Sequence, residues 1–163
     1  MPNETAVTDV TLDQILDGEA TMNDIFGFSD LQIQSIAVLG FQAYEQGRND
    51  EARILFEGLT ALDSKSYYGY AGLGVLALVE DDVDAAVDYL RQAAERTSGD
   101  AAVYANLGEA LFRQGKVEEA ADAFQKAIEL DPEGKDPGAN RARAMMYGVS
   151  VVLEEAAKAM EQE

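Results

Sequence analysis

AAVYANLGEALFRQGKVEEAADAFQKAIELDP is the sequence of residues 101–132. In this chain of 163 residues it shows most clearly a pattern that recurs along the sequence. Its Leu-Gly pair recurs at intervals of 34 residues, at positions 39–40, 73–74 and 107–108. An alanine of its second half recurs at the same interval, at positions 52, 86 and 120. A fixed period without insertions is the signature of stacked structural repeats. We therefore predict three equal units, at residues 33–66, 67–100 and 101–134.

Each unit is expected to consist of two closely packed helices. Gly40 and Ala52, with their equivalents in the other units, let the two helices approach each other. Leu39 and Phe56 are expected to fill the layer between neighbouring units. Apolar and polar residues nowhere alternate as they would in a half-buried strand. The pattern therefore predicts an all-α fold.

Turn residues follow the first helix of each unit. Gly47 and Gly115 suit the left-handed conformation that commonly ends a helix. The second unit has Asp81 at this place, and an aspartate tolerates that conformation less well. Pro132 is expected to end the third pair of helices.

The whole pattern resembles the tetratricopeptide repeat, and the third unit follows it almost throughout, ending in Asp131-Pro132. The resemblance implies three repeats stacked in a right-handed helical solenoid, in which the first helix of each repeat lines a concave face.

Both flanks of the repeats are expected to be helical. The acidic N-terminal segment, residues 1–32, is predicted to hold short helices at 11–17 and from Thr21 to Phe26. Ser29 with Gln32 is typical of a capping box that opens the first repeat. In the C-terminal segment, residues 135–163, a loop is expected to precede a helix over 140–160 that caps the repeats.

Composition excludes several classes of function. The chain has 31 Asp and Glu against 12 Lys and Arg, a formal charge of −19, and neither Cys nor His. Such a surface repels nucleic acids and anionic membranes. Thiol or imidazole catalysis, disulfides and Cys/His zinc sites are ruled out. Asp81, Asp82 and Asp84 lack the spacing of a calcium loop. We predict no enzyme, no metal site and no cofactor.

The expected location is the cytoplasm. The N-terminus carries no Lys or Arg and no apolar region follows it, and the longest mainly apolar stretch, 67–79, is too short to insert into a membrane. The acidity has three interpretations: a solvated surface, attraction of a basic partner, or adaptation to high salt.

An apolar, aromatic groove is predicted on the first helices of the repeats. Its lining is expected at fixed offsets from each Leu-Gly pair: Ala37, Phe41, Tyr44, Ala71, Val75, Leu78, Ala105, Glu109 and Phe112, with Tyr68 one turn before Ala71. An extended segment with apolar anchors, including proline, would fit best. The alternative is that some of the rings pack beneath the N-terminal segment. The positions of a carboxylate-binding clamp hold Ala37, Phe41, Gly72, Ala102 and Asn106, with no cation, which disfavours such a clamp.

A narrower resemblance covers about residues 12 to 156. The lead-in Gly18, Thr21, Met22, Asp24, Ile25, Gly27 and Phe28, the Phe41–Tyr44 pair, the Leu62-Asp63 step and Gly72-Leu73-Gly74 are similar to the class II chaperones of type III secretion systems. The resemblance implies a bacterial cytoplasmic chaperone that holds hydrophobic translocator proteins by gripping an extended client segment, often of Pro-x-Leu-x-x-Pro type.

The same resemblance implies a possible homodimer through the N-terminal helix. The candidate face comprises Leu12, Ile15, Leu16, Met22, Ile25 and Phe26. These residues could instead fold back and cap the first repeat. Some members of the family also regulate a transcription activator by binding that protein. The competing hypothesis is a general tetratricopeptide scaffold in a larger complex.

Overall fold

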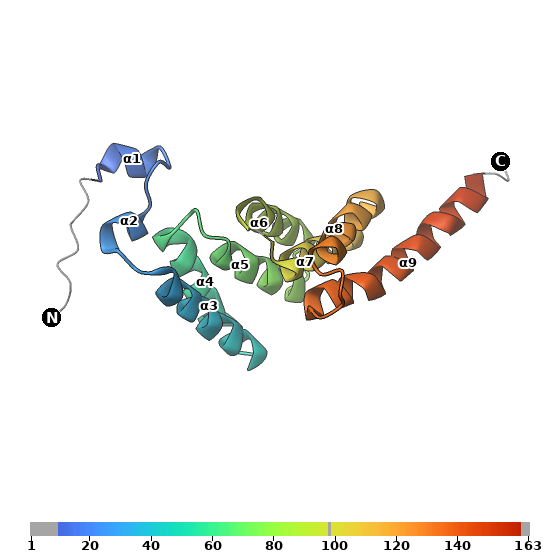
Figure 1. Ribbon diagram of the computed structural model, residues 1–163, viewed down its shortest axis with the longest axis horizontal. Helices are drawn as coiled ribbons and strands as arrows, with labels where there is room; N and C mark the ends of the chain where they lie inside the picture. Colours follow the sequence, from blue (N-terminus) through green and yellow to red (C-terminus); the bar gives the residue numbers. More distant parts are fainter. Residues whose placement is uncertain (1–9, 98, 161–163) are drawn as a thin grey trace. The chain divides into compact units, whose positions relative to one another are not determined.

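The computed structural model describes residues 10–97 and 99–160, and every regular element within these ranges is an α-helix (Figure 1). In chain order the helices are α1 (Leu12–Leu16), α2 (Met22–Phe26), α3 (Asp30–Glu45), α4 (Asn49–Leu62), α5 (Tyr68–Val79), α6 (Val83–Arg96), α7 (Ala101–Arg113), α8 (Val117–Leu130) and α9 (Pro137–Met160). The predicted all-α fold is confirmed. Residues 1–9 of the N-terminal segment and 161–163 of the C-terminal segment lie outside the described residues.

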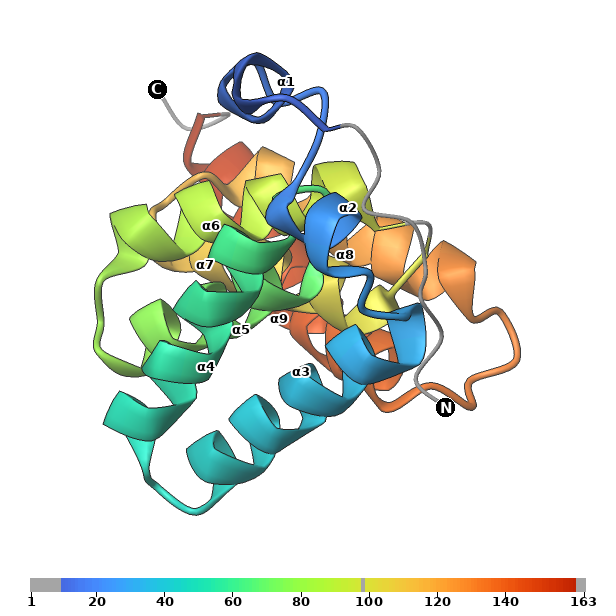
Figure 2. The same ribbon diagram turned by 90° about the vertical axis from the view of Figure 1, so that its left-hand side faces the viewer.

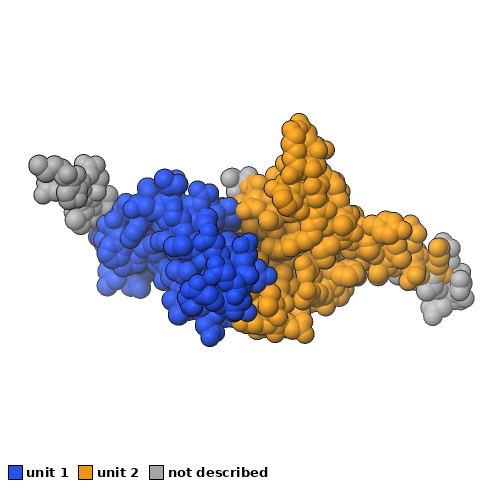
Figure 3. Space-filling model, turned by 90° about the horizontal axis from the view of Figure 1, so that it is seen from below, with its two compact units in different colours: residues 1–73 blue, residues 74–163 orange. Residues whose placement is uncertain are grey.

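The chain forms two compact units, residues 1–73 and 74–163, which divide within α5 (Figure 3). The first unit is built on the hairpin of α3 and α4, which lie side by side (Figure 2). The side chain of Phe56 on α4 is completely buried, and its ring lies 4.9 Å from that of Phe41 on α3. Gly40 and Gly72 leave the space that this ring occupies. Phe56 therefore fills the space between the first helices of the first two repeats, as predicted.

The second unit repeats this arrangement with its own residues. Leu90 on α6 and Phe124 on α8 are completely buried. A Cβ atom on Gly74 would lie 2.5 Å from the Leu90 side chain, and one on Gly108 would lie 2.5 Å from the Phe124 ring. Small residues in the first helix thus make room for a large one in the second.

Helix α9 covers α7 and α8, as expected of the closing helix. Ala139, Ala142 and Val149 are its buried residues. The helix begins at Pro137, three residues earlier than predicted. Proline suits a first helical position because its missing N–H has no partner there. The Asp136 carboxylate accepts a hydrogen bond of 2.9 Å from the N–H of Ala139, which caps this end.

The turns adopt the expected conformations. Gly47 and Gly115 have φ values of 74° and 82°, and Asp81 has a φ of 61°. Asp81 is the one non-glycine residue with positive φ in the described part of the chain. It therefore carries the strain that the two glycines avoid.

Reciprocal capping boxes start the first three helices. Thr11 with Gln14 caps α1, Thr21 with Asp24 caps α2, and the predicted pair of Ser29 with Gln32 caps α3. Because Ser29 is the cap, α3 starts at Asp30, three residues before the predicted start of the first repeat at residue 33. The boundaries at 32/33, 66/67, 100/101 and 134/135 stay predictions.

The prediction for Leu39 is wrong. Its side chain is 55% exposed, whereas the equivalent Leu107 is 9% exposed. Helix α7 packs against α6, the second helix of the preceding pair, and this contact accompanies the burial of Leu107. Within residues 10–29, the described helices before α3 are α1 and α2, of five residues each, and α2 packs against α4. A layer residue is buried only when a preceding hairpin covers it.

Candidate protein-binding surfaces

The predicted groove residues of the first unit differ in accessibility. Phe41 and Tyr44 on α3 are half-buried, as is Tyr68 at the start of α5, whose ring lies 4.2 Å from that of Tyr67. Ala37 and Ala71 are buried. Half-buried rings offer a partner apolar surface, whereas the two alanines offer almost none.

The predicted groove residues of the second unit show the same division. Val75, Glu109 and Phe112 are half-buried, while Leu78 and Ala105 are buried. Phe112 packs against the core of this unit. The Glu109 carboxylate accepts a hydrogen bond of 2.6 Å from the Arg113 guanidinium. The groove as a binding site stays a prediction, and its accessible part consists of the half-buried residues.

A cation lies beside Asn106, which is the polar residue among the positions of the carboxylate-binding clamp. The guanidinium of Arg141 on α9 donates a hydrogen bond to the Asn106 side chain on α7. This contact was not predicted, because Arg141 lies outside the first helices of the repeats. No local pattern reveals it, because residues 106 and 141 meet only when α9 packs on α7.

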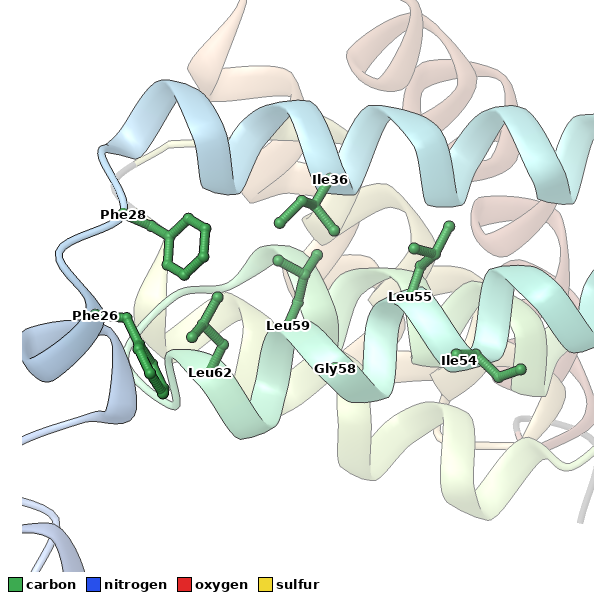
Figure 4. A pocket seen from close by; sticks show the side chains of 8 residues that line it. All are labelled: Phe26, Phe28, Ile36, Ile54, Leu55, Gly58, Leu59 and Leu62. Carbon is green, nitrogen blue, oxygen red and sulfur yellow. The ribbon is translucent and has the colours of Figure 1, made fainter. Parts of the chain in front are cut away.

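A large apolar pocket in the first unit was not predicted (Figure 4). Its volume is about 410 Å³, and we call it the α4 pocket. The lining residues come from α2 and the segment after it, from α3 and from α4: Phe26, Phe28, Ile36, Ile54, Leu55, Gly58, Leu59 and Leu62. Figure 4 shows Phe26, Phe28 and Leu62 at one end and Ile54 at the other. None of these residues belongs to the predicted groove.

Comparison between the repeats indicates that the apolar lining of the α4 pocket is specific to the first repeat. Ile54 is 68% exposed, and the residues 34 and 68 positions later are Asp88 and Asp122. Gly58 corresponds to Gln92 and Lys126. A smaller pocket in the second unit includes Asp122 and Lys126 among its lining residues. Comparison of the three repeats could therefore have predicted this pocket, because the second helix of the first repeat lacks the polar residues that the other two repeats have at these positions.

The candidate dimer residues divide between α1 and α2. Leu12 and Leu16 on α1 are 70% and 73% exposed, and Ile15 is half-buried. On α2, Met22 is partly exposed, Ile25 is half-buried and Phe26 lines the α4 pocket. Contacts between α2 and α4 place α2 on the first repeat, whereas the leucines of α1 remain open to solvent.

The ionisable groups indicate structural roles. Hydrogen bonds from the Thr21 backbone and hydroxyl lower the pKa of Asp24 from its ordinary value of 3.8. The hydrogen-bonded pair of Arg48 and Glu51 raises the pKa of the arginine and lowers that of the glutamate. All three groups lie at the surface in helix caps or a local ion pair. These shifts have local structural causes and mark no candidate catalytic acid or base.

The three neighbouring aspartates at the start of α6, Asp81, Asp82 and Asp84, have separate partners. Asp82 caps α6 through a hydrogen bond of 3.1 Å from the N–H of Ala85. Asp84 accepts one of 2.6 Å from Gln114, and Asp81 lies 4.0 Å from Arg113. In residues 10–97 and 99–160, no group of three potential ligands could hold a metal ion. The described helices also include none that is long and apolar enough to cross a bilayer.

Comparison with a curated protein locates the sequence similarity in a short region. The chain is 38% identical over 52 residues to the small glutamine-rich tetratricopeptide repeat-containing protein 2 of Mycosarcoma maydis. This match spans 32% of the chain and 15% of the relative.

Solved structures show the fold over most of the chain. A type III secretion system complex from Aeromonas hydrophila has a TM-score of 0.71 at 24% identity, covering 87% of this chain and 96% of that one. The Yersinia enterocolitica type III secretion chaperone SycD in complex with a peptide of the translocator YopD gives 0.63 at 23% identity, covering 76% and 95%. The same chaperone in an alternative dimer gives 0.66 at 23% identity, covering 77% and 97%. These likenesses show a tetratricopeptide-repeat solenoid.

The family comparison agrees with the observed helical hairpins. The profile described as "Tetratricopeptide repeat" matches residues 42–101 and 72–135, which together make up more than half of the chain. The chain belongs to the tetratricopeptide repeat family.

Proposed function

We propose that this protein is a cytoplasmic bacterial chaperone of type III secretion translocators. Its client is an extended apolar segment that contacts the half-buried groove residues on the first helices of the repeats. The chaperone keeps hydrophobic clients soluble until they are exported. The protein acts by binding and has no catalytic role.

Aromatic residues on the first helices carry this proposal. Phe41, Tyr44 and Phe112 are half-buried in a chain that is otherwise strongly acidic. Half-buried rings supply large contact areas at a low cost in conformational entropy. The likeness to a chaperone solved with a translocator peptide supports the same reading of the groove.

A homodimer through the N-terminal segment is part of the proposal. Leu12 and Leu16 are exposed on a helix that has its own capping box. Such a helix keeps its shape while presenting two leucines to a second copy. Because α2 packs on α4, α1 provides the candidate dimer contact.

Tyr44→Ala tests the groove. We would measure binding of a fluorescent peptide with a Pro-x-Leu-x-x-Pro motif by anisotropy, with the full-length chain. Truncation of an aromatic anchor is expected to weaken binding about tenfold or more. Tyr147→Ala is the matched control, because Tyr147 is 76% exposed on α9 and is not a predicted groove residue. Circular dichroism of both variants checks that their helices are intact.

Equal peptide affinity of the wild type and Tyr44→Ala would contradict the groove assignment. If the wild-type chain binds no peptide of this type and does not solubilise a co-expressed translocator, the chaperone function is wrong. The competing hypothesis of a general tetratricopeptide scaffold is then favoured. Secretion genes beside the coding gene favour the chaperone.

A further inference from the structure

We infer that the α4 pocket is a second protein-binding site, which takes a basic amphipathic helix. The partner helix inserts apolar side chains spaced one turn apart and surrounds them with Lys or Arg. This site is independent of the proposed function, because the pocket contains no groove residue. It belongs entirely to the first unit.

The size and lining of the pocket determine what it can hold. A cavity of about 150 Å³ is enough for benzene, so about 410 Å³ has room for two or more large apolar side chains. All eight lining residues are apolar or glycine. Leu59 forms a buried floor, and Ile54 is exposed at the edge. Such a surface binds apolar side chains and offers no side-chain donor or acceptor to a polar ligand.

Loss of polar residues from a solvent-facing helix needs a physical reason. Asp88 and Asp122 are exposed at the positions equivalent to Ile54. The repeat fold therefore accepts a carboxylate at this position, and packing within the unit does not require isoleucine. Ile54 extends an apolar surface that already includes Phe26 and Phe28. Contiguous exposed apolar surface of this kind is typical of an interaction site.

The shape of the pocket favours a helix as its occupant. The lining follows α4 from Ile54 to Leu62, a rise of about 12 Å at 1.5 Å per residue. Residues i and i+4 of a second helix are about 6 Å apart, so two such anchors fit along this length. The helix-in-groove mode uses anchors with this spacing.

Charge determines the character of the partner. Acidic residues outnumber basic ones near the lining: Asp24, Asp30, Glu57 and Asp63 lie on or beside the contributing helices, against Arg53 next to Ile54 and Lys65 near Asp24. Residues 1–73 carry 12 Asp or Glu and 3 Lys or Arg, a net charge of −9. A second copy would bring an equally acidic surface to the pocket, so its charge would not complement this one. Lys and Arg around the apolar anchors would complement this field.

Gly58→Leu provides the test, because a Cβ atom on Gly58 meets nothing within 4 Å and the leucine side chain would occupy the pocket. The matched control is Gly148→Leu, at an equally open helical glycine of α9. The probe is a labelled synthetic peptide of about eighteen residues, long enough to form a helix. It has leucines four residues apart on one face and lysines on the other. One companion peptide replaces leucine by serine, and another replaces lysine by glutamate.

The wild-type chain is expected to bind the leucine-lysine peptide at least about tenfold more tightly than either companion. Gly58→Leu should lose that affinity by a similar factor, and Gly148→Leu should retain it. Ile54→Asp is a second variant, which installs the residue found in the other two repeats, and it should also lose affinity. Thermal melting confirms that each variant is folded. Binding of the Pro-x-Leu-x-x-Pro peptide should be unchanged in all of them, which separates this site from the groove.

Three results would overturn the proposal, two from peptide binding and one from sedimentation. Equal binding of the serine companion, or full binding by a folded Gly58→Leu chain, would show that the peptide attaches through charge alone or elsewhere. Sedimentation provides the other: a wild-type dimer that Gly58→Leu dissociates and Gly148→Leu does not would assign the pocket to a second copy.

Discussion

A Cβ atom on Gly40 would lie 2.6 Å from Cε1 of Phe56. Real Cβ atoms do not approach other atoms so closely, so the ring occupies the place that any other residue at position 40 would need. Gly40 lies on α3 and Phe56 on α4, and the two helices pack at this contact.

Gly40→Ala should therefore destabilise the first unit. Overpacking of a filled core costs about 1–3 kcal/mol. Gly58→Ala is the matched control on α4, where a Cβ atom meets open space. It should stabilise the protein by about 0.5–1 kcal/mol, because alanine restricts the unfolded chain more than glycine does. Urea denaturation measures both changes, and a loss of stability in Gly58→Ala would contradict this account.

Asp81→Gly is expected to stabilise the turn between α5 and α6. A left-handed conformation costs an ordinary residue about 1–2 kcal/mol relative to glycine, and Asp81 has a φ of 61°. Its ion pair with Arg113 spans 4.0 Å between exposed groups and contributes little. The midpoint of thermal unfolding should rise. The reverse change, Gly115→Asp, should lower the midpoint, and a shift of the same sign in both would show that backbone strain is not the cause.

Leu39→Glu and Leu107→Glu should differ strongly although the repeats align these positions. Leu107 is 9% exposed, and a carboxylate there would lose apolar packing and hydration, at a cost of about 3 kcal/mol or more. Leu39 is 55% exposed, so its replacement should change stability by about 0.5 kcal/mol or less. Melting curves followed by circular dichroism compare the variants. Similar losses would mean that Leu39 is covered in solution.

Acidification should loosen the α2 capping box. Hydrogen bonds from Thr21 lower the pKa of Asp24 in the folded chain below its ordinary 3.8. The charged cap therefore stabilises α2 fully above pH 3.8, and this stabilisation is lost as the pH falls through the lower folded pKa. Amide exchange in α2 should accelerate over that range. Asp24→Asn should abolish the pH dependence there, and an unchanged profile in this variant would show that another group is responsible.

Local patterns were sufficient to predict much of the fold. The capping box at Ser29, the left-handed residues at Gly47, Asp81 and Gly115, and the burial of Phe56 follow from nearby residues or from the repeat period. Each depends on groups within one helix, one turn or one hairpin. Such interactions depend on neighbouring residues or recur at the repeat interval, so the sequence is enough to locate them.

The sequence alone thus determined an all-α chain of repeated helical hairpins with an acidic surface and no thiol or imidazole chemistry. Tertiary structure decided which apolar residues remain accessible. Leu39 is exposed and Leu107 is buried, the α4 pocket forms where α2 meets α3 and α4, and Arg141 reaches Asn106. The physical reason is that exposure depends on which other element covers a side chain, such as α6 beside α7, α2 beside α4 or α9 beside α7, and the repeat period alone does not specify this cover.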